Sequence, residues 1–123
     1  MTRSSLLVLV TPGKEDPDRA LLGLNTALVG ASSGVDVTVF FTLRGTQWAC
    51  AAQPATPITD EVMAVLGALE ESGARLECCS ACLDKHCVEA ARSPRSGLRE
   101  GVELVGLASM VQQSMAADAT LSF

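Results

Sequence analysis

Short apolar runs and longer amphipathic segments alternate along the chain. Five short runs are apolar or β-branched for most of their length, which is typical of strands buried in a sheet. They cover residues 5–10, 35–41, 75–79, 102–105 and 119–123. Between them, apolar residues recur every three or four positions. This spacing predicts helices over residues 17–32, 60–72, 81–92 and 106–116.

The strict alternation of strands and helices determines the expected fold class. Each strand–helix–strand unit forms a right-handed crossover, so repeated units give a parallel sheet with helices on both faces. We therefore predict a single domain over residues 1–123, with a three-layer α/β/α fold and a five-stranded parallel sheet. In such folds the working site lies at the carboxyl ends of the strands.

Three further predictions concern the helices and the long loop over residues 42–57. Thr59 is the expected N-cap of the second helix. The last helix is expected to turn its apolar stripe inward, with Leu107, Met110, Val111 and Met115. The loop is long for a compact domain, so we expect it to roof the site or to contact another subunit through Trp48. The alternative is that Trp48 covers the core.

Composition and charge narrow the possible partners. The chain is 48% apolar and carries a net charge of −5, with no block of basic residues. A chain with a net negative charge repels the phosphate backbone of nucleic acids, so we expect no nucleic-acid partner. The run Leu6–Val10 is too short for a signal peptide, and no apolar run is long enough to cross a membrane. We therefore expect a cytoplasmic protein with no membrane partner.

The stretch LECCSACLDKHC, residues 76–87, holds four of the five cysteines and the only histidine. Cys79 is expected at the end of the third strand and Cys82 in the first turn of the next helix. Backbone N–H groups at a helix start favour a thiolate there. His86 is four residues after Cys82, on the same helix face, where it could stabilise the thiolate or pass a proton. The alternative is that His86 faces solvent.

Other interpretations of this stretch are structural. Cys78 and Cys87 are expected to fill the core. The odd number of cysteines and a reducing compartment argue against a disulfide framework. The four possible zinc ligands between Cys79 and Cys87 fall within nine residues, which is compressed for structural zinc. We expect no metal and no cofactor. A thioredoxin-like dithiol stays open, because CxxC enters a helix.

Taken together, these segments resemble the DsrE/DsrF-like family of small sulfur-relay proteins. The resemblance is carried by ALVGASSGVDVTVFFTLRG (27–45), GARLECCSACL (73–83), GVELVGLASMV (101–111) and ADATLSF (117–123). It implies a five-stranded parallel sheet and assembly as homo-trimers, hexamers or related hetero-hexamers. Some relatives accept a persulfide sulfur on the cysteine after the third strand, and others have no assigned activity. That cysteine corresponds to Cys79, with Cys82 as the second member of the CxxC. Relatives often have an Arg-Gly pair where this chain has His86 and Cys87.

The leading hypothesis is a cytoplasmic sulfur relay. The Cys79 thiolate would take the outer sulfur of a donor protein's persulfide and pass it to an acceptor protein. Two other classes stay open: a non-catalytic oligomeric binding module, and a CxxC dithiol oxidoreductase. The sequence shows no plausible Ser-His-Asp or paired-carboxylate set. It leaves open whether the chain is itself a sulfurtransferase.

Overall fold

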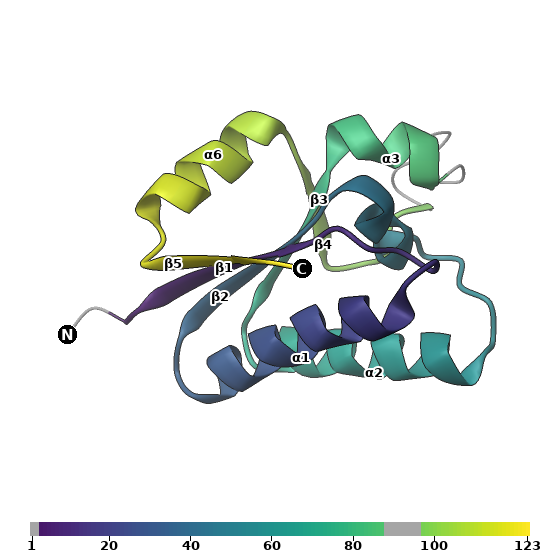
Figure 1. The fold of residues 1–123 in the computed structure, drawn as a ribbon, viewed down its shortest axis with the longest axis horizontal. Coiled ribbons are helices and arrows are strands. Elements are labelled where there is room, and N and C mark those ends of the chain that lie inside the picture. The colour runs from purple at the N-terminus through teal and green to yellow at the C-terminus, as the bar shows by residue number, and fades with distance from the viewer. Residues whose placement is uncertain (1–2, 88–96) are drawn as a thin grey trace.

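A five-stranded sheet forms the centre of the fold (Figure 1). The computed structural model of the chain describes residues 3–87 and 97–123. Neighbouring strands all pair in parallel, in the order β4-β3-β2-β1-β5. The strands are β1 (Ser5–Val10), β2 (Asp36–Phe41), β3 (Arg75–Cys79), β4 (Val102–Val105) and β5 (Ala119–Ser122). The predicted α/β fold class with a five-stranded parallel sheet is therefore confirmed.

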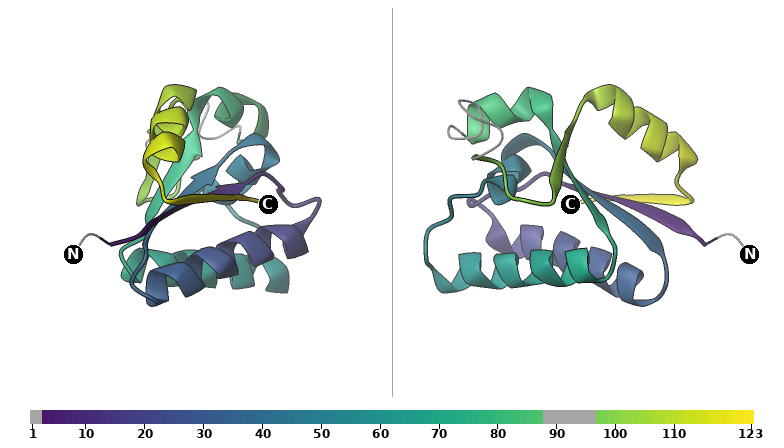
Figure 2. Two further views of the ribbon diagram at one scale, coloured as in Figure 1. Left: turned by 60° about the vertical axis from the view of Figure 1, so that its left-hand side comes forward. Right: turned by 180° about the vertical axis from the view of Figure 1, so that it is seen from behind.

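Helices cover both faces of the sheet (Figure 2). On one face lie α1 (Pro17–Ser32) and α2 (Pro57–Glu71), and on the other lie α3 (Ser80–His86) and α6 (Leu107–Ala116). The main core lies between the sheet and the first pair of helices, and a smaller cluster around Leu7, Phe40 and Cys79 lies beneath α6. Within the described residues, no helix is long and apolar enough to span a membrane.

Side chains along β2 alternate between these two faces. Val37 and Val39 belong to the main core, whereas Phe40 belongs to the cluster beneath α6. Thr38 therefore faces α6 as well, because alternate residues of a strand share a face. Its register partner on β3 is Arg75, and that of Phe40 is Glu77. Polar side chains from two strands thus lie on the face that α6 covers.

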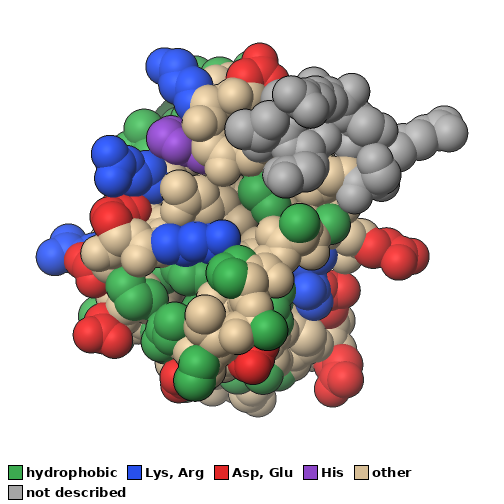
Figure 3. All heavy atoms as spheres, turned by 90° about the vertical axis from the view of Figure 1, so that its right-hand side faces the viewer, with side chains coloured by type: hydrophobic (Ala, Val, Ile, Leu, Met, Phe, Trp, Pro, Cys, Tyr) green, Lys and Arg blue, Asp and Glu red, His purple; other side chains and the backbone are tan. Residues whose placement is uncertain are grey.

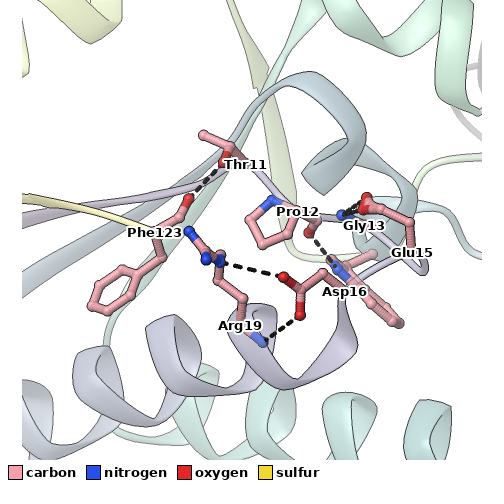
Figure 4. Close-up of polar contacts among 8 residues, drawn as sticks. Thr11, Pro12, Gly13, Glu15, Asp16, Arg19 and Phe123 are labelled. Carbon is pink, nitrogen blue, oxygen red and sulfur yellow. Dashed lines mark hydrogen bonds and ion pairs between the residues drawn. The ribbon is translucent and has the colours of Figure 1, made fainter.

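The loop after β1 is fastened to the C-terminus and to a neighbouring segment (Figure 4). The hydroxyl of Thr11 donates a hydrogen bond of 2.5 Å to the carbonyl oxygen of Phe123. The indole Nε1 of Trp48 donates to the carbonyl oxygen of Pro12 at 3.0 Å. The side chain of Asp16 caps the first turn of α1. These contacts fix the carboxyl end of β1, beside the end of β2.

The segment between β2 and α2 differs from the predicted open loop. Leu43–Ala49 forms a 3-10 helix, η1, and α2 begins at Pro57 rather than at residue 60. The N-cap is Thr56, whose hydroxyl accepts a hydrogen bond from the backbone N–H of Thr59 at 3.2 Å. The prediction of Thr59 as N-cap was wrong, because proline at the first helical position starts the helix earlier.

Trp48 is completely buried within the chain itself. Its indole belongs to the main core, and its N–H is already bonded to Pro12. The prediction that Trp48 contacts another subunit is therefore wrong, and the alternative that it covers the core is confirmed. The sequence could not place Trp48, because a lone aromatic residue in a polar loop gives the same pattern whether its side chain is buried or exposed.

Helix α6 turns most of its apolar stripe away from the sheet. Leu107, Val111 and Met115 are 52%, 55% and 84% exposed, and only Met110 of the predicted inward residues packs on the cluster beneath the helix. The prediction was wrong at these three positions. Helical spacing identifies an apolar stripe, but it does not say which side of the helix meets the sheet. The side that meets the sheet also carries Gln113.

Helix α3 follows β3 without an intervening loop. It begins at Ser80, with Cys79 rather than Ser80 at the N-cap position and no side-chain capping bond. The described helix ends at His86, whereas the predicted helix ran to residue 92. The rest of that prediction, and most of the predicted 93–97 loop, falls on residues 88–96, outside the described part of the chain.

Candidate functional site

The carboxyl ends of β2 and β3 bring two segments together at one edge of the sheet. From β2 the chain passes through Thr42 into η1, and from β3 it passes from Cys79 into α3. Helix α3 packs mainly against η1, which brings Cys82 beside Thr42. The start of η1 lies so close to β1 that a Cβ atom on Gly45 would be 2.0 Å from the carbonyl oxygen of Val10. Only glycine fits at this position.

The sulfur of Cys82 lies in a small group of hydrogen-bond donors, which we call the thiolate cradle: Thr42, Leu43 and Cys79. The Oγ1 atom of Thr42 is 3.5 Å from the Sγ atom of Cys82. The backbone N–H of Leu43 and the side chain of Cys79 lie close enough to this sulfur to lower its pKa. Leu43 has a φ of 51°, a left-handed conformation that is rare for leucine. Such outliers in backbone conformation cluster at functional sites.

The thiolate cradle lowers the pKa of the Cys82 thiol. Burial raises this pKa, but the hydrogen bonds from Thr42, the Leu43 N–H and Cys79 lower it, and the positive charge of Lys85 adds to them. The net direction is downward. A larger fraction of Cys82 is therefore thiolate at neutral pH than in an ordinary cysteine, and the thiolate is the nucleophile. The side chain is only partly buried, so a substrate can reach it.

Cys78 and Cys79 are both completely buried, on opposite faces of the sheet. Burial raises the pKa of Cys78 to about 12, and the neighbouring sulfurs of Cys79 and Cys82 act in the same direction. Cys78 is therefore a protonated core residue, which confirms its predicted place. Cys79 faces the cluster beneath α6 and lies beside Cys82. Of the two predicted reactive cysteines, Cys82 alone reaches the surface.

His86 ends α3 and is partly exposed. Figure 3 looks onto the end of the molecule where the strands end, and it shows the histidine between basic side chains on the surface. Within the described residues, His86 and Cys82 share no hydrogen bond. A role for His86 as proton shuttle or thiolate partner stays a prediction. The cation that acts on the Cys82 thiolate is its neighbour Lys85.

Cys50 and Cys87 form a disulfide, with Cα atoms 5.9 Å apart and a sequence separation of 37. The bond ties the end of η1 to the end of α3. Both cysteines are buried, as predicted for Cys87. The prediction that the thiols are unpaired was wrong for these two. Sequence alone does not show that a residue after η1 lies beside one after α3.

The residues weighed as zinc ligands are not brought together. Cys87 is bonded to Cys50, while Cys79 and Cys82 lie at the other end of α3. Among residues 3–87 and 97–123, no three side chains of His, Cys, Asp or Glu converge on a point where a metal ion could sit. The described residues instead place the Cys82 sulfur beside the hydroxyl of Thr42.

Two members of the thiolate cradle were missed as site residues in sequence. Thr42 stands directly after a buried strand, at the edge where parallel α/β folds place their sites, and this position is the signal that could have identified it. Leu43 carries no such signal. Its contribution comes from its backbone N–H and a left-handed conformation, and leucine gives no indication of either.

Comparisons with known proteins agree with this architecture. The family model described as "DsrE/DsrF-like family" matches residues 4–123. Among solved structures, the ychN protein from E. coli is similar at a TM-score of 0.74 and 18% identity, covering 100% of both chains. A conserved protein of unknown function, BT1422 from Bacteroides thetaiotaomicron, has a TM-score of 0.65 and 14% identity, covering 98% of this chain and 95% of its own. At these identities the likeness concerns the fold. No curated protein matches the chain by sequence.

Proposed function

The chain belongs to the DsrE/DsrF-like family, and we propose that it is a sulfur-relay protein that carries a persulfide on Cys82. The observation that carries this proposal is the placement of the Cys82 sulfur. It is partly exposed, it lies 3.5 Å from the hydroxyl of Thr42, and its pKa is lowered. A low-pKa, accessible thiol is the requirement for accepting sulfur from a persulfide. The geometry favours Cys82 over Cys79 as the first carrier, because Cys79 is completely buried.

Loading and transfer are two exchange steps without net oxidation. The Cys82 thiolate attacks the outer sulfur of a donor protein's persulfide, R–S–SH. The donor S–S bond breaks, R–S⁻ leaves, and Cys82–S–SH is formed. An acceptor thiolate then attacks the outer sulfur, and the Cys82 thiolate leaves. The donors in the thiolate cradle stabilise the anion both before loading and after transfer.

Cys79 has a separate place in this scheme. Its side chain packs beside Cys82 and lowers the pKa of that thiol, so it is close enough to react with a persulfide there. If the Cys79 thiolate attacks the inner sulfur of Cys82–S–SH, a Cys79–Cys82 disulfide forms and HS⁻ leaves. Complete burial of Cys79 limits access to its sulfur, which limits this side reaction. We therefore propose that Cys79 mainly stabilises the Cys82 thiolate. Release of sulfide through Cys79 is a slow alternative.

The proposal is tested by measuring the sulfane sulfur that the protein binds. The fully reduced protein is incubated with a low-molecular-weight persulfide and passed through a desalting column, and the sulfane sulfur that stays with it is measured as thiocyanate after cyanolysis. We expect about one equivalent per chain for the wild type and for Cys79→Ser, and none above background for Cys82→Ser. Equal loading of Cys82→Ser and wild type contradicts Cys82 as carrier.

The contact between Cys79 and Cys82 also favours a second candidate function, a dithiol oxidoreductase. Two neighbouring thiols, one buried and one accessible, resemble the arrangement that such enzymes need. The two functions differ in their need for Cys79. Reduction of insulin disulfides by a dithiol enzyme is lost in both single variants, whereas sulfur loading persists in Cys79→Ser.

We further propose that the chain forms homo-oligomers through the outer face of α6, which carries Leu107, Val111 and Met115. Exposed apolar patches of this kind on monomers usually mark interaction sites. No charged residue occurs between Leu104 and Ala117, although the chain carries a net charge of −5. A second copy of an acidic chain meets no like-charge repulsion on this face.

The family resemblance favours a trimer or a hexamer. We also propose that the sulfur-relay protein acts in the cytoplasm.

A further inference from the structure

Helix α6 lies on the face of the sheet opposite α1 and α2 (Figure 2), and it contributes no buried residue. Helices α1 and α2 bury apolar side chains such as Leu24 and Leu66 in the main core. The start of α6 also has no side-chain cap. Because burial of apolar surface is what holds most helices in place, α6 gains little stability from its position on the sheet.

Two contacts close α6 onto the sheet. Met110 packs on the small cluster that contains Cys79. The side-chain nitrogen of Gln113 donates a hydrogen bond to the carboxylate of Glu77, a residue of β3 that is only 4% exposed. The side-chain oxygen of Gln113 is buried without a partner in the described part of the chain, so the closed arrangement carries an energetic cost at the same residue.

Packing beneath the second half of α6 is incomplete. A cleft of about 240 Å³ separates Gln113 and Ala116 from the amino ends of the strands. Groups that face such a space lack packing partners on that side. Both ends of α6 continue into strands, β4 before it and β5 after it, so the helix can lift as one segment while the sheet stays paired. Local opening of this kind requires less free energy than unfolding of the main core.

The burial of Cys79 depends on this helix, whereas that of its neighbour Cys78 does not. Both side chains are completely buried. Cys78 belongs to the main core on the side of α1 and α2, and Cys79 belongs to the cluster on which Met110 packs. Lifting α6 therefore exposes Cys79 and leaves Cys78 covered.

We propose that α6 is a movable cover over Cys79, held closed by Met110 and by the hydrogen bond from Gln113 to Glu77, and that its opening controls whether sulfur on Cys82 is kept or released. The second half of this proposal rests on the proposed sulfur relay. The first half concerns the helix alone.

The position of the cover decides what happens to Cys82–S–SH. While α6 is closed, no solvent reaches Cys79 to take its proton, and the persulfide waits for an acceptor protein. When α6 is open, Cys79 loses its proton to solvent, and its thiolate attacks the inner sulfur of the persulfide. A Cys79–Cys82 disulfide forms, and HS⁻ leaves. The exchange consumes one persulfide and needs no further oxidant or reductant.

Alkylation of the folded Cys82→Ser variant tests the cover without any sulfur transfer. With the Cys50–Cys87 disulfide intact, Cys78 and Cys79 are its only thiols. We expect iodoacetamide to modify Cys79 at least about tenfold faster than Cys78, because Cys78 waits for the main core to unfold. Fragmentation of the peptide between the two cysteines separates the two rates.

Urea below the unfolding transition separates opening from intrinsic reactivity. It should accelerate the modification of Cys78 more steeply than that of Cys79, since unfolding of the core exposes more surface than lifting α6. The measurement is repeated with Val111→Glu added, because a copy docked on the outer face of α6 would itself hold the helix closed. Equal rates and equal urea dependence for the two cysteines in both preparations overturn the cover.

Two alanine variants on α6 identify the contact that holds the cover. Met110→Ala, added to Cys82→Ser, should speed the alkylation of Cys79 about three- to tenfold. Gln112→Ala, at an exposed position of the same helix, is the matched control and should leave the rate unchanged. An unchanged rate in Met110→Ala contradicts the assignment of Met110.

Sulfide release tests the second half of the proposal. Protein with Cys82 intact is loaded from a low-molecular-weight persulfide and desalted, and the HS⁻ released per bound sulfur is followed over time. Met110→Ala should release it about three- to tenfold faster than the wild type and Gln112→Ala, and Cys79→Ser should release none above background. Release from Met110→Ala at the wild-type rate overturns control by the cover. Absence of bound sulfur on the wild type instead contradicts the relay and leaves the alkylation result standing.

Discussion

The Oγ1 atom of Thr42 and the Sγ atom of Cys82 lie 3.5 Å apart, although 40 positions separate the two residues in sequence. They meet because β2 and β3 are neighbours in a parallel sheet and their carboxyl ends lie at one edge. The contact places a hydroxyl donor on the sulfur that we propose as sulfur carrier. The reactivity of Cys82 should therefore depend on a residue far from the cysteine-rich stretch.

Replacing Thr42 by valine removes this donor and keeps the side-chain shape. The pKa of Cys82 is lowered by the hydrogen bond, so its loss should move the pKa upward, and the alkylation of Cys82 should need a higher pH. At pH 7 we expect alkylation by iodoacetamide to slow about three- to tenfold. The measurement is the rate against pH, followed at the Cys82 peptide. Thr26→Val, on α1, is the control and should leave the profile unchanged.

The left-handed backbone of Leu43 gives a second prediction. Leu43→Gly suits a φ of 51°, so we expect it to retain the low pKa of Cys82 and to change the free energy of unfolding by less than about 1 kcal/mol. A β-branched residue opposes this conformation, so Leu43→Val should destabilise the fold by about 1–2 kcal/mol and slow the alkylation of Cys82 at pH 7. Denaturant unfolding and alkylation rates measure the two effects. Identical behaviour of the two variants would contradict a backbone role for Leu43.

Much of this fold follows from the sequence because its strands are buried and its elements alternate. The bounds of β1 and α1 agree with those predicted from apolar runs and helical spacing, since burial on both faces leaves a continuous apolar signal. The outward face of α6 was not predictable in the same way. Its apolar stripe has no charged neighbour to mark the solvent side, so spacing alone gave the wrong orientation.

The candidate site was predictable only where its residues are close in sequence. Cys79 and Cys82 follow from the strand–helix junction. The sequence does not show which of the two is exposed, because Cys79 is buried by a tertiary contact with α6. The thiolate donors Thr42 and Leu43, like the partner of Cys87, come from the segment after β2. Their approach is set by strand order, which no local pattern contains.

The Cys50–Cys87 disulfide should contribute to stability by closing a long loop of the unfolded chain. Cys87→Ser should lower the free energy of unfolding by about 2–4 kcal/mol under non-reducing conditions. Dithiothreitol should lower the free energy of unfolding of the wild type by a similar amount and leave that of the variant unchanged. Urea unfolding with and without dithiothreitol makes the comparison. A wild type insensitive to reductant would show that this bond does not stabilise the fold.

The outer face of α6 gives a prediction about assembly. Val111→Glu places a charge on the uncharged face that we propose as the contact between copies, so it should dissociate the oligomer. Val29→Glu, on α1, is the matched control, since Val29 is also exposed, at 67% compared with 55% for Val111. Sedimentation equilibrium at micromolar concentration should give a trimer or hexamer for the wild type and the control. A wild type with the mass of one 12.8 kDa chain contradicts the assembly.

The central claim is that Cys82 receives the transferred sulfur, and peptide-resolved mass spectrometry tests it most directly. The reduced protein is treated with a persulfide donor, the remaining thiols are blocked, and the peptides carrying residues 76–87 are fragmented between the cysteines. We predict an added mass of about 32 Da, one sulfur atom, on Cys82 in the wild type and in Cys79→Ser. The Thr42→Val variant should acquire this added sulfur on Cys82 more slowly. An added sulfur on Cys79 with Cys82 unmodified, or no added sulfur on either cysteine, would contradict the account.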